Sequence, residues 1–147
     1  GELIAAFLWA QMEEAEAITA KRLDIWNHYH QGFQTLEESG RVRRPVIPVD
    51  CLHNAHMYYL LLRELEDRTR FIAKMKEIEI GCVFHYVPLH SSVFACTGGQ
   101  FEQRRLEFTD RFSSMIVRLP LWIGINTFQE SIIVGSINSL GFHSKKS

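Results

Sequence analysis

The N-terminal part of the chain, from Glu2 to Ser39, has the spacing of apolar side chains that is typical of helices. It contains no proline, and apolar residues recur every three or four positions. The expected stripe consists of Ile4, Leu8, Gln11, Ala15, Ile18, Arg22, Ile25 and Tyr29, widened by Phe7, Trp26 and Phe33. A single helix of this length is unusual in a globular domain, so we expect a break between Thr19 and Leu23. Gly40 is expected to cap the C-terminal end.

After an extended, proline-containing linker from Arg41 to Pro48, the pattern changes to short apolar runs that predict strands. The first predicted strand, 56–62, is apolar on both faces, which is typical of a central strand in a covered sheet. The second, 82–87, ends before Pro88, and the third, 116–119, ends before Pro120. Between 90 and 107 we expect no regular element.

Helices are predicted between and after these strands. Asp67 is the expected N-cap of a helix that ends near Ile80, and a short helix is expected to start near Thr109. A final helix is expected after a capping box formed by Thr127 and Glu130. The predicted fold is therefore α+β. Residues 1–40 are expected to form a helical interdomain region, and 41–147 a core with a small mixed or antiparallel sheet covered by helices.

Composition and charge narrow the class of protein. Apolar residues make up 46% of the chain and the formal net charge is -1, which is ordinary for a soluble domain. We therefore expect neither a nucleic acid nor a membrane as partner. The three cysteines are odd in number and lack metal-binding spacing, so we expect a reducing, cytoplasmic location. The chain opens in a helical pattern without a leading methionine, which suggests a fragment.

The seven histidines do not form a convincing metal site. His28 and His30 are two positions apart on a predicted helix and point in nearly opposite directions, so they cannot share an ion. No histidine pair has a carboxylate or cysteine at ligand spacing, which disfavours a metal-dependent hydrolase. We expect no metal ligand in this chain.

The exit of the second predicted strand is the best candidate for a ligand site. His85, Tyr86 and His90 lie where the chain leaves a buried strand and turns at Pro88, and such strand ends often build small-molecule sites. The alternative is structural: an imidazole packs inside while Tyr86 covers the sheet. From the residues alone, both interpretations remain open.

The sequence of this segment resembles a motif of a known family. HYVPLHS (85–91) resembles the strand-and-turn signature in the C-terminal domain of the DegT/StrS family of PLP-dependent sugar aminotransferases. Four further stretches resemble the family in its own order, namely ELIAAFLWAQMEEAEAI (2–18), NAHMYY (54–59), DRTRFI (67–72) and VRLPLW (117–122). Within the family, these motifs are most similar to those of the transaminases of dTDP-4-keto-6-deoxyglucose, which form a dTDP-4-amino-4,6-dideoxygalactose. The stretch 93–107 departs from the family pattern.

The resemblance implies the small C-terminal domain of a fold-type I PLP transferase. In such an enzyme a large N-terminal domain, absent from this chain, holds PLP, the chain forms a homodimer, and the substrate is a 4-keto-6-deoxy nucleotide sugar. His85, Tyr86 and His90 are then implied to be substrate-binding, and His56 is a weaker candidate.

Transamination requires a Schiff-base lysine. The lysines of this chain lie on predicted amphipathic helices or in the polar tail, and they are Lys21, Lys74, Lys76, Lys145 and Lys146. We therefore expect no catalytic or cofactor-binding residue here, no bound PLP, and no activity from this chain alone. The alternative is a standalone α+β ligand-binding or regulatory module without catalysis.

Overall fold

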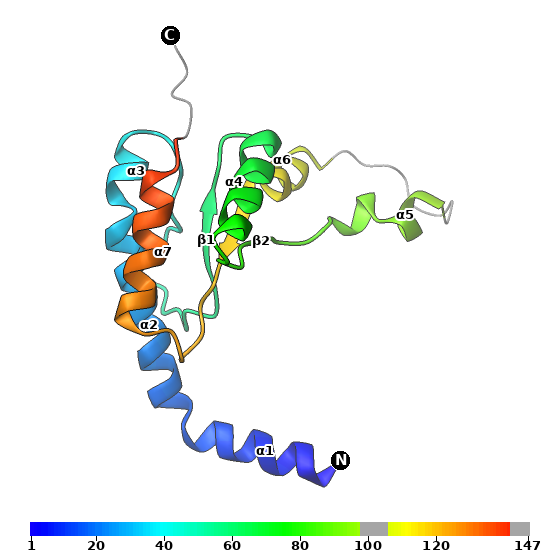
Figure 1. The fold of residues 1–147 in the computed structure, drawn as a ribbon. Coiled ribbons are helices and arrows are strands. Elements are labelled where there is room, and N and C mark those ends of the chain that lie inside the picture. Colours follow the sequence, from blue (N-terminus) through cyan, green and yellow to red (C-terminus); the bar gives the residue numbers. More distant parts are fainter. Residues whose placement is uncertain (98–105, 142–147) are drawn as a thin grey trace.

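The first helix projects away from the body of the molecule, and the two helices that follow it form one wall of that body (Figure 1). In this computed structural model, residues 1–97 and 106–141 are described. Helix α1 spans Glu2–Glu13, α2 spans Ala15–Gly32 and α3 spans Gln34–Glu38. The bend lies at Glu14, not at the predicted 19–23. No residue of α1 is buried, so no packing holds it in line with α2, and the acidic cluster at 13–16 disfavours a continuous helix there.

Gly40 ends α3 as the sequence predicts. Its φ is +67°, in the left-handed region that glycine adopts without a steric penalty. The amide of Gly40 donates to the carbonyl of Glu37, and the amide of Arg41 donates to the carbonyl of Leu36. These two bonds form a Schellman motif, which satisfies carbonyls that the helix leaves open.

The sheet is small and antiparallel, in agreement with the predicted fold class. It contains β1 (Tyr58–Leu61), β2 (Val83–Phe84) and β3 (Ile116–Leu119), in the order β1-β3-β2. The central strand is therefore β3, and the prediction that the first strand is central is wrong. β1 is apolar on both faces because both are covered: the adjacent residues Leu60 and Leu61, which point to opposite faces, are both buried. Its outer edge is bridged by Arg43 of the linker, which pairs with Leu61.

The second strand is shorter than predicted. Phe84 is paired with Val117, and β3 begins one residue earlier, at Ile116. His85 and the residues after it therefore have almost no partner strand left, and the chain leaves the sheet. It continues through a 3-10 turn, Leu89–Ser91, into the short helix α5, Val93–Thr97, within the stretch for which no regular element was predicted.

Three further helices complete the structure: α4 (Leu65–Glu77), α6 (Glu107–Met115) and α7 (Thr127–Ser139). Asp67 is not the N-cap of α4, because the extended residue before this helix is Glu64. Asp67 lies in the first turn instead, where its negative charge interacts favourably with the positive end of the helix dipole.

The cap of α7 also differs from the prediction. Asn126, not Thr127, accepts the amide proton of Gln129, and the side chain of Gln129 accepts from the amide of Asn126. This pair is the capping box, so Glu130 has no part in it. The Thr-x-x-Glu pattern is displaced by one residue from the true box, because Asn and Gln fill the same roles.

The core lies between the sheet and the helices that cover it. Tyr58 of β1 is fully buried, and its ring lies 5.4 Å from that of Tyr29 and 5.3 Å from that of Trp26, both on α2. Helix α4 packs against β2 and β3. The largest fully buried side chains of the described part are Tyr29, Tyr58, Phe33, Phe71, Leu36, Leu60, Leu62, Met75, Ile137 and Val117.

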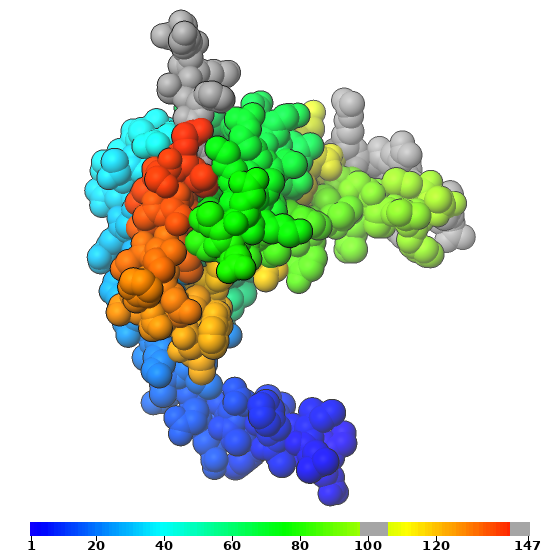
Figure 2. Space-filling view, in the orientation of Figure 1, coloured from blue at the N-terminus to red at the C-terminus, as the bar shows by residue number. Residues whose placement is uncertain are grey.

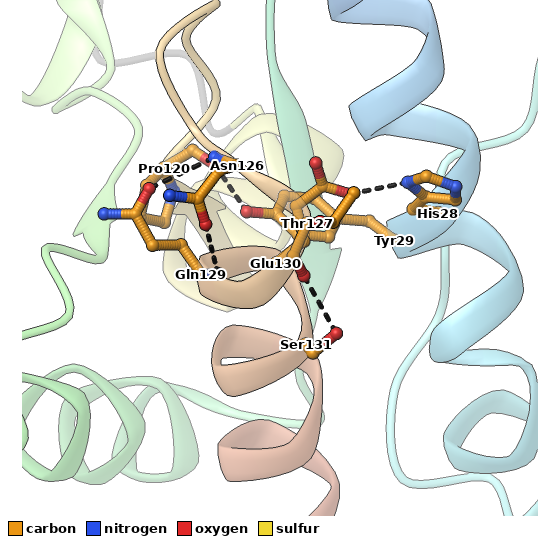
Figure 3. Close-up of polar contacts among 8 residues, drawn as sticks. All are labelled: His28, Tyr29, Pro120, Asn126, Thr127, Gln129, Glu130 and Ser131. Carbon is orange, nitrogen blue, oxygen red and sulfur yellow. Dashed lines mark hydrogen bonds and ion pairs between the residues drawn. The ribbon is translucent and has the colours of Figure 1, made fainter.

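Helices α2 and α7 run side by side in the same direction (Figure 1). Their contact is close at Gly32, where a Cβ atom would come within 2.7 Å of a methyl group of Val134. Asn138 donates from its side chain to the carbonyl of Gly32 at 3.0 Å. At the other end, His28 Nδ1 lies 2.5 Å from the carboxylate of Glu130 (Figure 3). The packing thus relies on a small residue at the crossing and polar bonds on both sides of it.

Candidate functional site

An open apolar groove lies where the chain leaves β2. One wall is the segment from His85 to Leu89, and the other comes from α6 and the start of β3, including Phe108, Phe112 and Ile116. Its volume is about 610 Å³. Beyond the groove the chain extends from the body as an arm that carries α5 (Figures 1 and 2). An apolar groove with a few polar groups is the usual form of a small-molecule site.

His85 is the partly buried polar group of this groove. Its Nδ1 atom is buried and has no hydrogen-bond partner among the described residues. Burial lowers the pKa of His85 below its ordinary value, and the nearby charges of Arg118 and His56 lower it further. The imidazole is therefore neutral at pH 7, so it can both donate and accept a hydrogen bond.

Tyr86 is the exposed aromatic group beside it. Its side chain is 67% exposed, and its ring meets that of His85 edge to face, with 4.6 Å between the centroids. The ring can stack on a planar or sugar-like ligand, and the hydroxyl can form a hydrogen bond with that ligand. His85 and Tyr86 thus both line the groove.

His90 is not part of the groove lining. Its Nε2 atom lies 2.7 Å from the carboxylate of Asp110 on α6. This contact links the arm to α6. His56 is exposed, and its Nδ1 contacts the side chain of Asn54, which fits a local structural role.

The aromatic residues of the second wall were missed by sequence reasoning. Phe108 and Phe112 are four positions apart on α6, so they lie on one face of that helix. Phe108 is 75% exposed, which is unusual for a phenylalanine unless it faces a partner or a ligand. The signal was the pair of aromatics at helical spacing, but the predicted helix began at Thr109 and excluded Phe108.

The described lysines, candidates for covalent attachment of PLP, all lie at the surface of the structure. Lys21, Lys74 and Lys76 are all exposed, on α2 and α4, whereas a Schiff-base lysine needs a desolvated setting. Lys145 and Lys146 lie outside the described residues. None of the three described lysines therefore has the desolvated setting of a Schiff-base lysine in this structure.

Other chemistry has little support in the described part of the chain. No group of three or more His, Cys, Asp or Glu residues described by the structure could hold a metal ion. Burial raises the pKa of the Cys82 thiol to about 12, so it is not a nucleophile at neutral pH. None of the helices in residues 1–97 and 106–141 is long and apolar enough to cross a membrane.

A comparison with known families identifies the family of the chain. The model of the DegT/DnrJ/EryC1/StrS aminotransferase family matches residues 1–138. The chain belongs to this family. It is also similar to an uncharacterized protein of Methanocaldococcus jannaschii, with 34% identity over 87 residues, which are 57% of this chain and 22% of that protein.

Solved structures of aminotransferases share the fold. DesV of S. venezuelae, in complex with a ketimine intermediate, has a TM-score of 0.79 and 19% identity over 90% of this chain and 34% of its own. The aminotransferase TlmJ of Streptoalloteichus hindustanus has a TM-score of 0.78 and 18% identity over 88% of this chain and 33% of its own. PseC of Helicobacter pylori, an aminotransferase involved in the biosynthesis of pseudoaminic acid, has 0.77 and 16% over 88% and 34%. The chain spans about a third of the length of these structures.

Proposed function

We propose that the chain is the C-terminal portion of an aminotransferase that uses PLP to transfer an amino group to a 4-keto-6-deoxy nucleotide sugar. The observation that carries this proposal is the groove between His85–Leu89 and α6. It joins an aromatic ring, a neutral imidazole and an apolar floor, which suit the flat faces and hydroxyl groups of a sugar ring. The family membership gives the class of reaction.

In this proposal the groove binds and orients the sugar but performs no chemistry. PLP supplies the electron sink for amino transfer when it is bound. The lysine that carries it belongs to a part of the polypeptide outside these residues, because the described lysines are exposed. His85 and Tyr86 position the substrate, His90 holds the arm through Asp110, and no residue described here is assigned a catalytic role.

The exposed helix α1 supports a larger protein as the working unit. Six of its apolar side chains are more than half exposed, namely Leu3, Ile4, Phe7, Leu8, Trp9 and Met12. Apolar surface of this kind is normally covered by a partner. We propose that it packs against a PLP-holding domain of the same polypeptide, and that two such polypeptides form a homodimer in the cytoplasm.

The complete gene product tests the role of the groove. Steady-state kinetics would compare Tyr86→Ala with the wild type, using nucleotide sugar and amino donor in turn. An aromatic contact is worth up to about 1.5 kcal/mol, so we expect KM for the nucleotide sugar to rise up to about tenfold. The half-reaction with the amino donor alone should not change, because it involves no sugar.

The matched control is Phe128→Ala, which removes another exposed aromatic side chain, on α7 and outside the groove. Equal loss in both variants, or loss of the donor half-reaction in Tyr86→Ala alone, would contradict a substrate-binding role. A gene product without amino-transfer activity on any 4-keto nucleotide sugar would overturn the proposed function itself.

A further inference from the structure

A second depression, away from the groove, gathers positive charge. It has a volume of about 580 Å³ and lies between the turn after α3, the end of β1, the start of α4 and α6. Five of the residues that line it are arginines, namely Arg41, Arg43, Arg63, Arg70 and Arg111. Three parts of the sequence, near positions 42, 66 and 111, therefore bring arginines to one place.

The acidic residues at this place do not balance the arginines. Glu37, Glu64 and Asp67 also line the depression. Glu37 is already engaged, because its carboxylate accepts from the backbone amide and the Nε of Arg44 at 2.7 and 2.6 Å. Asp67 lies 3.9 Å from Arg70 Nη1, a long ion pair. The excess of positive charge is notable in a chain whose net charge is -1.

Two of the arginines have side chains without a partner in the described part of the chain. Arg43 and Arg111 are exposed residues, and no hydrogen bond or ion pair to another described residue satisfies their guanidinium groups. Arg63, by contrast, donates from Nε and Nη2 to the carbonyl of Gly40 at 3.1 and 3.0 Å. The site thus combines a guanidinium fixed by the Schellman turn with two that are available to a ligand.

Like charges in one depression repel one another, and a multiply charged anion removes this repulsion. Guanidinium groups bind phosphate oxygens with two parallel hydrogen bonds, so arginine is the residue best suited to such a ligand. We propose that this depression, which we call the arginine site, binds a diphosphate group, either as free pyrophosphate or as part of a nucleotide. This assignment does not depend on the proposed function.

The arginine site and the groove lie on different faces of α6. Phe108 and Phe112 face the groove, whereas Arg111 and Met115 line the arginine site. A ligand in one site therefore does not fill the other. The two sites can be tested separately, with variants that change one and leave the lining of the other intact.

Isothermal titration calorimetry on the complete gene product tests the arginine site, with inorganic pyrophosphate as the probe. Arg43→Gln and Arg111→Gln each remove a charge-assisted contact, so we expect each to weaken binding about tenfold or more. The double variant should weaken it further. Lys21→Gln is the matched control, because it removes an exposed positive charge on α2, outside this depression, and should leave binding unchanged.

Two further titrations distinguish the sources of the diphosphate. If free pyrophosphate is the ligand, ADP should bind no more tightly than pyrophosphate, and if a nucleotide is the ligand, ADP should bind more tightly. Adenosine should not bind to the site in either case. Absence of pyrophosphate binding, or binding that both arginine variants leave unchanged while their melting temperatures match the wild type, would overturn the proposal. Failure of amino transfer would not affect these outcomes.

Discussion

Glu130 is the one charged side chain that is buried among the described residues, with 7% of its surface exposed. Its carboxylate is held by His28 alone of the described residues (Figure 3), and its charge helps to raise the pKa of Tyr29, whose burial is the larger cause. A buried carboxylate without a hydrogen bond is costly. The contact between α2 and α7 therefore depends on an imidazole that is itself half exposed.

This dependence predicts that the effect of Glu130→Gln on the free energy of unfolding changes sign when His28 is replaced by alanine. His28→Ala should lower the free energy of unfolding by about 1–3 kcal/mol at pH 7, because it leaves the Glu130 carboxylate without its partner. In that background, Glu130→Gln should restore part of the loss, since a neutral amide is less costly to bury than a charge. In the wild type, the same Glu130→Gln change should be destabilising. Urea unfolding of the three variants measures these effects.

His56→Ala serves as the control, because His56 is exposed and contacts only Asn54 among the hydrogen-bond partners described. It should change stability by less than about 0.5 kcal/mol. If Glu130→Gln has the same sign in both backgrounds, the pair is not coupled as described.

Single residues were the least predictable part of the structure. The segment that carries His85 and Tyr86 could be found, because a proline after an apolar run marks a strand exit. The separation of His90 from the groove could not, because it depends on Asp110, which is 20 residues later in the chain. Glu130 was assigned to a local cap for the same reason, since its true partner is 102 positions away.

At the scale of elements, the start of α7 is a place where the cap predicted from the local sequence differs from the cap in the structure. The sequence favours Thr127 as the cap, but Asn126 makes the bonds. Asn126→Ala should therefore destabilise the protein by about 0.5–2 kcal/mol. Thr127→Ala, its neighbour and matched control, should change stability little. Thermal unfolding of the two variants measures the difference, and a larger effect at Thr127 would support the cap predicted from sequence.

The elements themselves were predicted well wherever apolar periodicity was strong. The third strand was predicted with its observed bounds, and α4 and α7 were expected close to where they lie. Strand order was not predictable, because β3 pairs with β1 and β2 through contacts that are distant in the sequence. The bridge from the linker residue Arg43 to the outer edge of β1 is likewise absent from the local pattern. The bend at Glu14 was misplaced because neither proline nor glycine marks it.

At the scale of the whole molecule, the exposed α1 predicts how the chain behaves when expressed on its own. Its apolar side chains have no contact that buries them, so we expect concentration-dependent self-association. Phe7→Glu combined with Leu8→Glu should shift the chain toward monomers in sedimentation velocity. Val49→Glu with Leu52→Glu adds the same charge at exposed apolar positions of the loop before β1 and should not do so. Equal behaviour of the two double variants would argue against α1 as the associating surface.

The fold class was predictable at this scale from two sources. The succession of helical and strand patterns predicts α+β, and the family resemblance of five stretches in one order predicts the aminotransferase family to which the chain belongs. The arginine site was not predictable, because its members come from segments whose proximity only the fold establishes.

The pairing of α2 with α7 has a consequence for the order in which the protein acquires its structure during synthesis. The two residues of the His28–Glu130 contact are 102 positions apart, and ribosomes add about 5–20 residues each second. One face of α2 therefore waits roughly 5–20 s for the helix that covers it. During this time the buried rings of Trp26 and Tyr29 on α2 can be covered by Tyr58, which is synthesised earlier than α7. Nascent chains that stall before α7 should be the form of this protein most dependent on chaperones.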